Sequence, residues 1–300
     1  MLSPLEAMFS PMSRSQFFEH YLGDVPVVVN DVQGVFSALT SLPFLTSLDD
    51  LFRVWPAQVS AYLPGTPDEV NSGMVSVADA KKVFTEEGRG LCFDDANRYC
   101  SEISEWLEML KMDLGLSNLT ISRSLIYATA KGKGTATHFD QNINFIYQVH
   151  GTKKWWVAPN TSVSNPMTRH TLGHPLDAEL ASYTENDMPE EMPDDAQEFL
   201  LEPGSLMFLP RGAWHKTEAI SDAISLNFTY SAPTWIDILS AALRGRLAGS
   251  SVWRETASFV NDEDLHVQAI DKFDHLLGEL AKEVPRWRAF DILGATESTE

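Results

Sequence analysis

A polar row inside an apolar stretch, residues 135–146, carries the side chains best suited to chemistry. The stretch reads Thr-Ala-Thr-His-Phe-Asp-Gln-Asn-Ile-Asn-Phe-Ile. Its period of two favours a β-strand whose one face carries His138, Asp140, Asn142 and Asn144. Side chains two residues apart on a strand point the same way, so His138 and Asp140 can hold one metal ion between them. The sequence therefore predicts part of a metal site on this strand.

A third ligand is needed, and His215 is the best candidate. It lies in Leu-Pro-Arg-Gly-Ala-Trp-His-Lys-Thr, residues 209–217, at the start of another short alternating run. Two histidines and one carboxylate on one face of a metal ion leave three positions open, which suits an Fe(II) ion that activates oxygen beside a chelating cosubstrate. We therefore expect His138, Asp140 and His215 to bind one divalent metal.

With these residues in place, the chain resembles the JmjC-type (cupin-fold) Fe(II)- and 2-oxoglutarate-dependent oxygenases. Within them it resembles the protein-hydroxylase branch, which includes ribosomal oxygenases and the asparaginyl hydroxylase of hypoxia signalling. The resemblance covers roughly positions 10 to 232, and His138, Asp140 and His215 fit the HxD…H triad of the family. Ribosomal oxygenases often carry a second acidic residue soon after the aspartate, whereas Asn142 to Asn144 stand here, so the subfamily stays open.

The resemblance also implies a site for 2-oxoglutarate. Lys153 lies where the family places the basic residue that pairs with the distal carboxylate of the cosubstrate. Lys154 adjoins it, and because neighbouring strand residues face opposite ways, only one of the two can enter the barrel. The family spacing selects Lys153. The resemblance implies three further positions that line the cosubstrate site, which are Thr135, Asn144 and Asn227. Tyr127 is another candidate donor to the same carboxylate.

The implied cofactors are Fe(II), 2-oxoglutarate and O2, with no catalytic residue beyond the metal ligands. The leading hypothesis is hydroxylation of a C–H bond in an amino-acid side chain of a protein or peptide, with release of succinate and CO2. Three alternatives stay open. The chain could be an N-methyl-lysine demethylase, a small-metabolite hydroxylase of the same fold, or a metal-binding cupin without turnover.

Composition and charge limit the class of protein. A chain of 300 residues with 44% hydrophobic content can bury a sizeable core. Without a long apolar run or a basic, then apolar, N-terminus, we expect a cytoplasmic protein without a membrane partner. The formal charge of −20 argues against a nucleic-acid partner and favours a cationic one. Cys92 and Cys100 are expected to be reduced thiols.

Short alternating runs separated by frequent turns point to an antiparallel barrel or sandwich. The resemblance narrows this to a mainly β fold with flanking helices, a double-stranded β-helix (cupin/JmjC jelly roll). We expect one continuous strand through residues 138–145 and a hairpin over residues 145–158 that turns at Gly151. The predicted domains are residues 1–232, the oxygenase domain with an N-terminal helical flank, and residues 233–300, a C-terminal helical segment.

Two further segments bear on partners. Residues 175–198 are strongly acidic, and no Lys or Arg lies between Arg169 and Arg211. This segment is either a solvated loop or a lid that contacts a basic substrate. After Pro233 the pattern becomes helical and amphipathic. These helices either pack onto the barrel of the same chain or form a homodimer, as they often do in the resembled branch.

Overall fold

The computed structural model describes residues 3–63, 66 and 71–297, so the last three residues of the predicted C-terminal segment lie outside it. Contacts divide the chain into two compact units. Unit 1 comprises residues 1–116 and 121–231, and unit 2 comprises residues 117–120 and 232–300. In the described part of the chain, no helix has both the length and the apolar character needed to cross a membrane.

Unit 1 begins with a helical flank. In α2 the hydroxyl of Ser13 accepts from the backbone N–H of Gln16 in a capping box, and Gly23 ends the helix, so the predicted helix is confirmed. The helices of this flank are α1 (Pro4–Met8), α2 (Arg14–Leu22), α3 (Ser37–Thr40), α4 (Leu48–Val54), α5 (Val77–Glu87) and α6 (Ser101–Asp113), with short 3-10 turns at Val32–Gly34 and Ala96–Arg98.

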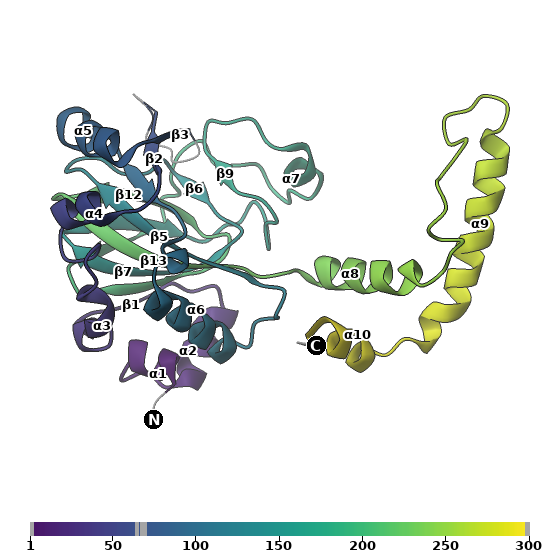
Figure 1. The fold of residues 1–300 in the computed structure, drawn as a ribbon, viewed down its shortest axis with the longest axis horizontal. Helices are drawn as coiled ribbons and strands as arrows, with labels where there is room; N and C mark the ends of the chain where they lie inside the picture. Colours follow the sequence, from purple (N-terminus) through teal and green to yellow (C-terminus); the bar gives the residue numbers. More distant parts are fainter. Residues whose placement is uncertain (1–2, 64–65, 67–70, 298–300) are drawn as a thin grey trace. The chain divides into compact units, whose positions relative to one another are not determined.

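An eight-stranded antiparallel sheet forms one layer of unit 1, in the order β1-β11-β7-β13-β5-β4-β2-β3. Its strands β5, β13 and β7 lie side by side in Figure 1. Its strands are β1 (Val27–Val29), β2 (Val59–Tyr62), β3 (Ser72–Val75), β4 (Leu91–Phe93), β5 (Ile121–Thr129), β7 (Ile143–His150), β11 (Leu206–Leu209) and β13 (Ala223–Ser231).

A five-stranded antiparallel sheet forms the second layer, in the order β10-β8-β12-β6-β9. Its strands are β6 (His138–Phe139), β8 (Lys153–Ala158), β9 (His170–Thr171), β10 (Gln197–Leu201) and β12 (Trp214–Ala219). Two antiparallel sheets with flanking helices confirm the predicted mainly β fold.

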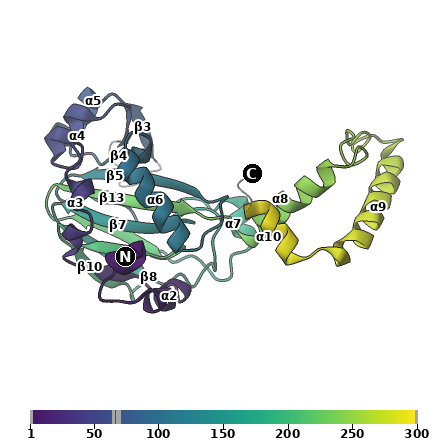
Figure 2. The same ribbon diagram turned by 60° about the horizontal axis from the view of Figure 1, so that its bottom comes forward.

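The central strands of the eight-stranded sheet, β11, β7 and β13, are buried on both faces. The inner face of this sheet meets the five-stranded sheet in a shared apolar cluster, which includes Ile146 and Met207 from one sheet and Trp155 from the other. Its outer face carries the helical flank, where Phe17 of α2 packs on Phe145 and Phe208, and α6 lies across the strands (Figure 2). This burial explains why β7 reads as an almost continuous apolar run.

The predicted continuous strand through residues 138–145 is wrong. Pairing stops after Phe139 in β6 and resumes at Ile143 in β7, and the two strands belong to different sheets. Asp140 lies at this crossing, where its backbone carbonyl accepts from the N–H of Gly212 at 2.8 Å. The alternating pattern persists through the crossing because the linking residues still line the space between the sheets.

The predicted hairpin over residues 145–158 is also wrong. A tight turn at Gly151, which has a positive φ of 65°, does connect β7 to β8. However, β7 pairs with β11 and β13, whereas β8 pairs with β10 and β12. The turn therefore joins one layer to the other, which places Lys153 at the start of a strand that faces the first sheet.

The acidic segment, residues 175–198, is ordered against the five-stranded sheet. It contains α7 (Ala178–Ser182), whose Leu180 is fully buried with Phe139 and Trp214. These two residues adjoin His138 and His215 in β6 and β12, so they lie on the opposite face of the sheet from the two histidines. None of residues 175–198, all of which are described, contributes to the cavity that the histidines line.

Unit 2 is helical. It consists of α8 (Trp235–Ala248), α9 (His266–Glu283), a 3-10 turn at Val284–Arg286, and α10 (Ala289–Glu297). Arg246 of α8 forms an ion pair with Glu283 of α9 at 3.1 Å, and α10 contacts α8. Glu297 accepts from the hydroxyl of Ser117 at 2.6 Å, which ties the short segment 117–120 to this unit.

Candidate metal and cosubstrate site

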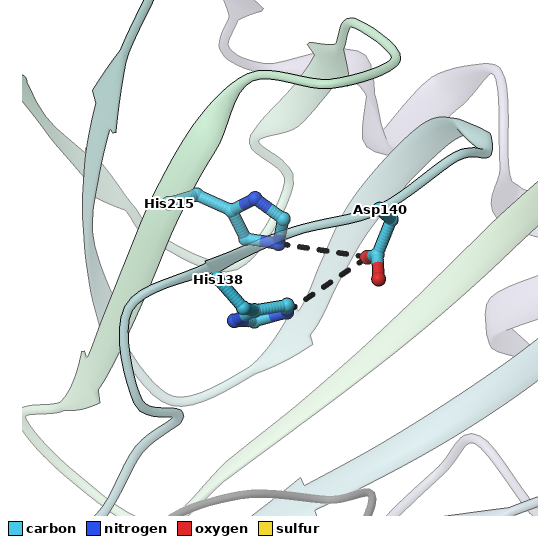
Figure 3. Close-up of side chains that lie close together, drawn as sticks. All are labelled: His138, Asp140 and His215. Atoms are coloured by element: carbon cyan, nitrogen blue, oxygen red, sulfur yellow. Dashed lines mark ion pairs between the residues drawn. The ribbon is translucent and has the colours of Figure 1, made fainter. Parts of the chain in front are cut away.

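Three predicted ligands converge at one point between the sheets (Figure 3). The Oδ2 atom of Asp140 lies 3.8 Å from Nε2 of His138 and 3.7 Å from Nε2 of His215. Metal–ligand bonds to nitrogen and oxygen are about 2.0–2.2 Å long, so two atoms that share one ion lie roughly 3–4 Å apart. The two distances to Asp140 therefore fit a single shared ion, and all three ligand atoms lie within 4.8 Å of one another.

Strand pairing explains how residues far apart in sequence meet here. β6 pairs with β12 so that His138 and His215 are direct cross-strand partners, and their ring centroids are 4.1 Å apart. The turn before β12 is fixed by Gly212, whose positive φ of 81° is a conformation that side chains rarely adopt. A Cβ atom there would also meet the ring of Pro166.

Both imidazoles are held in the form that binds metals. Nδ1 of His138 lies 2.7 Å from the carbonyl oxygen of Ala136, and Nδ1 of His215 lies 2.9 Å from that of Ala213. A carbonyl only accepts, so each Nδ1 carries the proton and each Nε2 keeps its lone pair for the cavity. The donor set of two neutral imidazoles and one carboxylate suits Fe(II).

Electrostatics support the same protonation state. Burial, assisted by the positive charge of Arg169 and opposed in part by the hydrogen bond to Ala136, lowers the pKa of His138 to about 3. Burial also lowers the pKa of His215 to about 3, assisted by His138 and opposed in part by Asp140. Both rings are therefore neutral at pH 7, and their contacts with Asp140 are a convergence of ligand atoms rather than charge pairs.

A cavity of about 210 Å³ opens beside the three residues. All eight residues predicted to bind metal or cosubstrate line it. They are His138, Asp140, His215, Lys153, Thr135, Asn144, Tyr127 and Asn227. They come from both sheets and from the crossing segment, so the site exists only because the two layers face each other.

The two neighbouring lysines face opposite ways. Lys153 is 4% exposed, and its Nζ lies 5.9 Å from the ring centre of Tyr127 and 5.7 Å from that of Trp155. Lys154 points away from the cavity and pairs with Glu198 at 2.8 Å. The cavity therefore receives the positive charge of Lys153.

Further polar atoms around the cavity fit a small dicarboxylate. The Thr135 hydroxyl lies 3.1 Å from that of Thr217. Oδ1 of Asn227 and Nε1 of Trp155 are buried with no hydrogen-bond partner among the described residues. Buried polar atoms are normally satisfied, so such atoms beside a buried ammonium indicate a place for a polar ligand.

Thr217 and Arg169 line the cavity but were not predicted from the sequence. Thr217 follows His215 by two residues on β12, so the period of two that identified Asp140 from His138 would have found it. Arg169 lines the cavity and its Nε lies 3.6 Å from Oδ1 of Asp140. No local pattern marks it, because its position depends on pairing between the two-residue strands β6 and β9.

Comparison with known proteins agrees with this geometry. The JmjC domain family model matches residues 103–238. The uncharacterized protein YxbC of Bacillus subtilis is 33% identical over 286 residues, which cover 93% of this chain and 85% of YxbC. This chain belongs to the JmjC family of 2-oxoglutarate-dependent oxygenases. Ribosomal oxygenase 2 of Rattus norvegicus is 25% identical over 252 residues, or 80% of this chain, but the match spans only half the length of that relative.

Solved structures show the same JmjC fold. The structure of YcfD, a ribosomal oxygenase from Escherichia coli, in complex with cobalt and 2-oxoglutarate, superposes with a TM-score of 0.53 at 18% identity. The superposition covers 90% of this chain and 67% of YcfD.

Proposed function

We propose that this protein uses Fe(II), 2-oxoglutarate and O2 to hydroxylate a C–H bond in an amino-acid side chain of a protein or peptide. One observation carries the proposal: the ligand atoms of His138, Asp140 and His215 converge in a cavity that also contains the buried ammonium of Lys153. The balanced reaction converts the substrate C–H bond, one 2-oxoglutarate and one O2 into the product alcohol, succinate and CO2, with one atom of O2 in succinate and the other in the alcohol.

Different residues of the cavity would hold the iron, bind 2-oxoglutarate and limit access of water. Neutral Nε2 atoms of His138 and His215, together with the Asp140 carboxylate, would hold the iron. When bound, the iron supplies oxygen activation coupled to loss of CO2 from 2-oxoglutarate. Lys153 would bind the distal carboxylate of the cosubstrate through a charge-assisted hydrogen bond, assisted by the Thr135 hydroxyl. Apolar cavity walls, including Leu209, would limit access of water.

A protein substrate is favoured by the relatives, several of which are named ribosomal oxygenases. A basic partner is favoured by charge, since the formal charge of the chain is −20. The acidic segment exposes many of its carboxylates on the side of the five-stranded sheet away from the cavity. We propose that it attracts a basic substrate over distance rather than closing over it.

The proposal includes a homodimer formed through the C-terminal helices. Helix α9 buries none of its 18 residues, all of which are described, and it exposes an apolar stripe of Val267, Ile270 and Leu277. These positions recur at helical spacing, as expected for a face that packs against another helix.

The test of function is direct. Purified protein with Fe(II) should convert 2-oxoglutarate to succinate, and a basic peptide should stimulate the conversion. Mass spectrometry of lysate proteins treated with the enzyme should show a gain of one oxygen on a side chain. Loss of a methyl group from lysine instead would indicate a demethylase, and stimulation only by small metabolites would exclude a protein substrate. An absence of succinate under all conditions would leave a metal-binding cupin.

A further inference from the structure

Strand register places Arg169 directly beside Asp140. In the antiparallel pair of β6 and β9, His138 lies opposite Thr171, and Phe139 lies opposite His170. The next pair in this register is Asp140 and Arg169. The Nε atom of Arg169 is 3.6 Å from Oδ1 of Asp140, and the two side chains are only 17% and 20% exposed. The contact is therefore built into the sheet and mostly shielded from solvent.

The two carboxylate oxygens of Asp140 face different partners. Oδ2 faces Nε2 of both histidines, at 3.8 and 3.7 Å, while Oδ1 faces Arg169. The main chain at Asp140 is also held, because its carbonyl accepts from the N–H of Gly212 at 2.8 Å. With the backbone fixed, rotation of the side chain is the main remaining freedom, and Arg169 faces one end of the carboxylate.

We infer that Arg169 is a positioning residue that holds Oδ1 of Asp140 away from the metal, so that Oδ2 alone is presented beside His138 and His215. The inference rests on the proposed metal site. A carboxylate that bound through both oxygens would occupy a fourth position of a six-coordinate ion. Binding through one oxygen would keep three positions available for a bidentate cosubstrate and O2.

Two effects of Arg169 on metal affinity oppose each other. A fixed positive charge near a cation site weakens binding, whereas a partner that orients a ligand strengthens it, commonly by about 10- to 100-fold. If Arg169 acts only as a charge, its removal should tighten metal binding. If it positions Asp140, its removal should weaken binding and change the coordination of the metal.

The experiment uses Co(II) with the 300-residue protein after removal of any bound metal. Affinity is measured by calorimetry, and the visible absorption spectrum of bound Co(II) is recorded with and without 2-oxoglutarate, because it reports the number and arrangement of ligands. We expect Arg169→Gln to bind Co(II) about 10- to 100-fold more weakly than the unaltered protein, with a changed spectrum. Arg169→Lys keeps the charge but not the planar fork, and should give an intermediate affinity with a changed spectrum.

Lys216→Gln is the matched control. Lys216 adjoins His215 on β12, but its Nζ lies over the ring of Trp156, 5.0 Å from the ring centre. This variant removes the same charge from the same sheet and should keep the Co(II) affinity and spectrum of the unaltered protein. Thermal unfolding shows which variants fold, and if Arg169→Gln does not fold, Arg169→Lys decides.

Unchanged or tighter Co(II) binding in Arg169→Gln, or weaker binding with an unchanged spectrum, would overturn the inference. An unchanged spectrum in Arg169→Lys would overturn it as well. Asp140→Ala separates this failure from failure of the proposed function. If Asp140→Ala loses Co(II) binding while Arg169→Gln keeps it, only the positioning role is wrong. If Asp140→Ala also keeps it, the metal site itself is wrong.

Discussion

Replacing Lys153 by Met removes a buried positive charge while leaving a side chain of similar length to pack against Trp155. In the proposed complex this change leaves the distal carboxylate of 2-oxoglutarate without its cationic partner. A hydrogen bond to a charged group is worth about 1.5–3 kcal/mol, which corresponds to roughly ten- to over a hundredfold in affinity. Because Lys153 is only 4% exposed, little solvent screening reduces this effect.

Lys154→Met provides the comparison within the same strand. Lys154 pairs with Glu198 at 2.8 Å, and the two side chains are 29% and 53% exposed. Such surface ion pairs contribute about 0–1 kcal/mol to stability, and this one lies outside the cavity. Lys154→Met should therefore leave the affinity for 2-oxoglutarate unchanged.

Calorimetric titration of 2-oxoglutarate into each protein loaded with Co(II) measures the effect, and a separate Co(II) titration checks that metal binding is intact. The reasoning is refuted if Lys154→Met weakens 2-oxoglutarate binding and Lys153→Met does not. It is also refuted if Lys153→Met weakens binding of the metal as much as binding of the cosubstrate, because the lysine would then act on the metal site.

Three further predictions concern the metal, the substrate and assembly. Asp140→Ala removes the anionic ligand, so Fe(II) affinity and succinate formation should collapse while circular dichroism shows an intact fold; near-normal turnover would contradict the triad. Peptide-stimulated turnover at subsaturating peptide should fall as salt rises, since charge attraction is screened over about 8 Å at physiological ionic strength. Four exposed carboxylates of the acidic segment are Glu190, Glu191, Asp194 and Asp195. Changing them to the neutral amides should flatten the salt dependence while uncoupled 2-oxoglutarate turnover stays constant. A salt response equal to that of the unaltered protein would exclude a role of the acidic segment in attracting the peptide. Ile270, which is 46% exposed, lies in the apolar stripe of α9, and Ile270→Asp places a charge there. This variant should be a monomer in light scattering where the unaltered protein is a dimer, whereas an unchanged mass would exclude this face of α9 as the dimer interface.

Local patterns in the sequence were sufficient for much of the site. The two-residue spacing of His138 and Asp140, and the opposite facing of Lys153 and Lys154, depend only on the geometry of a strand. Helix signals such as the capping box at Ser13 are equally local, because the groups that bond lie within one turn. The resemblance to the JmjC family added the order of these features, and the comparisons confirmed that the chain belongs to this family.

The partners of each strand were decided by the tertiary structure. Residues 138–145 carry a polar side chain at every second position from His138 to Asn144, yet the chain passes from one sheet to the other after Phe139. The pattern of residues 145–158 predicts a hairpin, yet β7 pairs with β11 and β13, whereas β8 pairs with β10 and β12. A period of two reports which way a side chain points, but not which strand lies beside it, because backbone hydrogen bonds are the same for every residue except proline.

The same limit explains Arg169 and the acidic segment. Arg169 comes beside Asp140 only through a two-residue pairing between strands about thirty residues apart in the sequence, and neither strand has a pattern long enough to predict. The acidic composition of residues 175–198 is evident from the sequence. The burial of Leu180 against Phe139 and Trp214, which holds the segment on the face of the sheet away from the cavity, could not be predicted, because no pattern distinguishes Leu180 from other apolar residues. Sequence determined which side chains could do the chemistry, whereas packing of the two sheets decided which of them meet, since contacts between distant residues arise only when whole layers bury their apolar faces together.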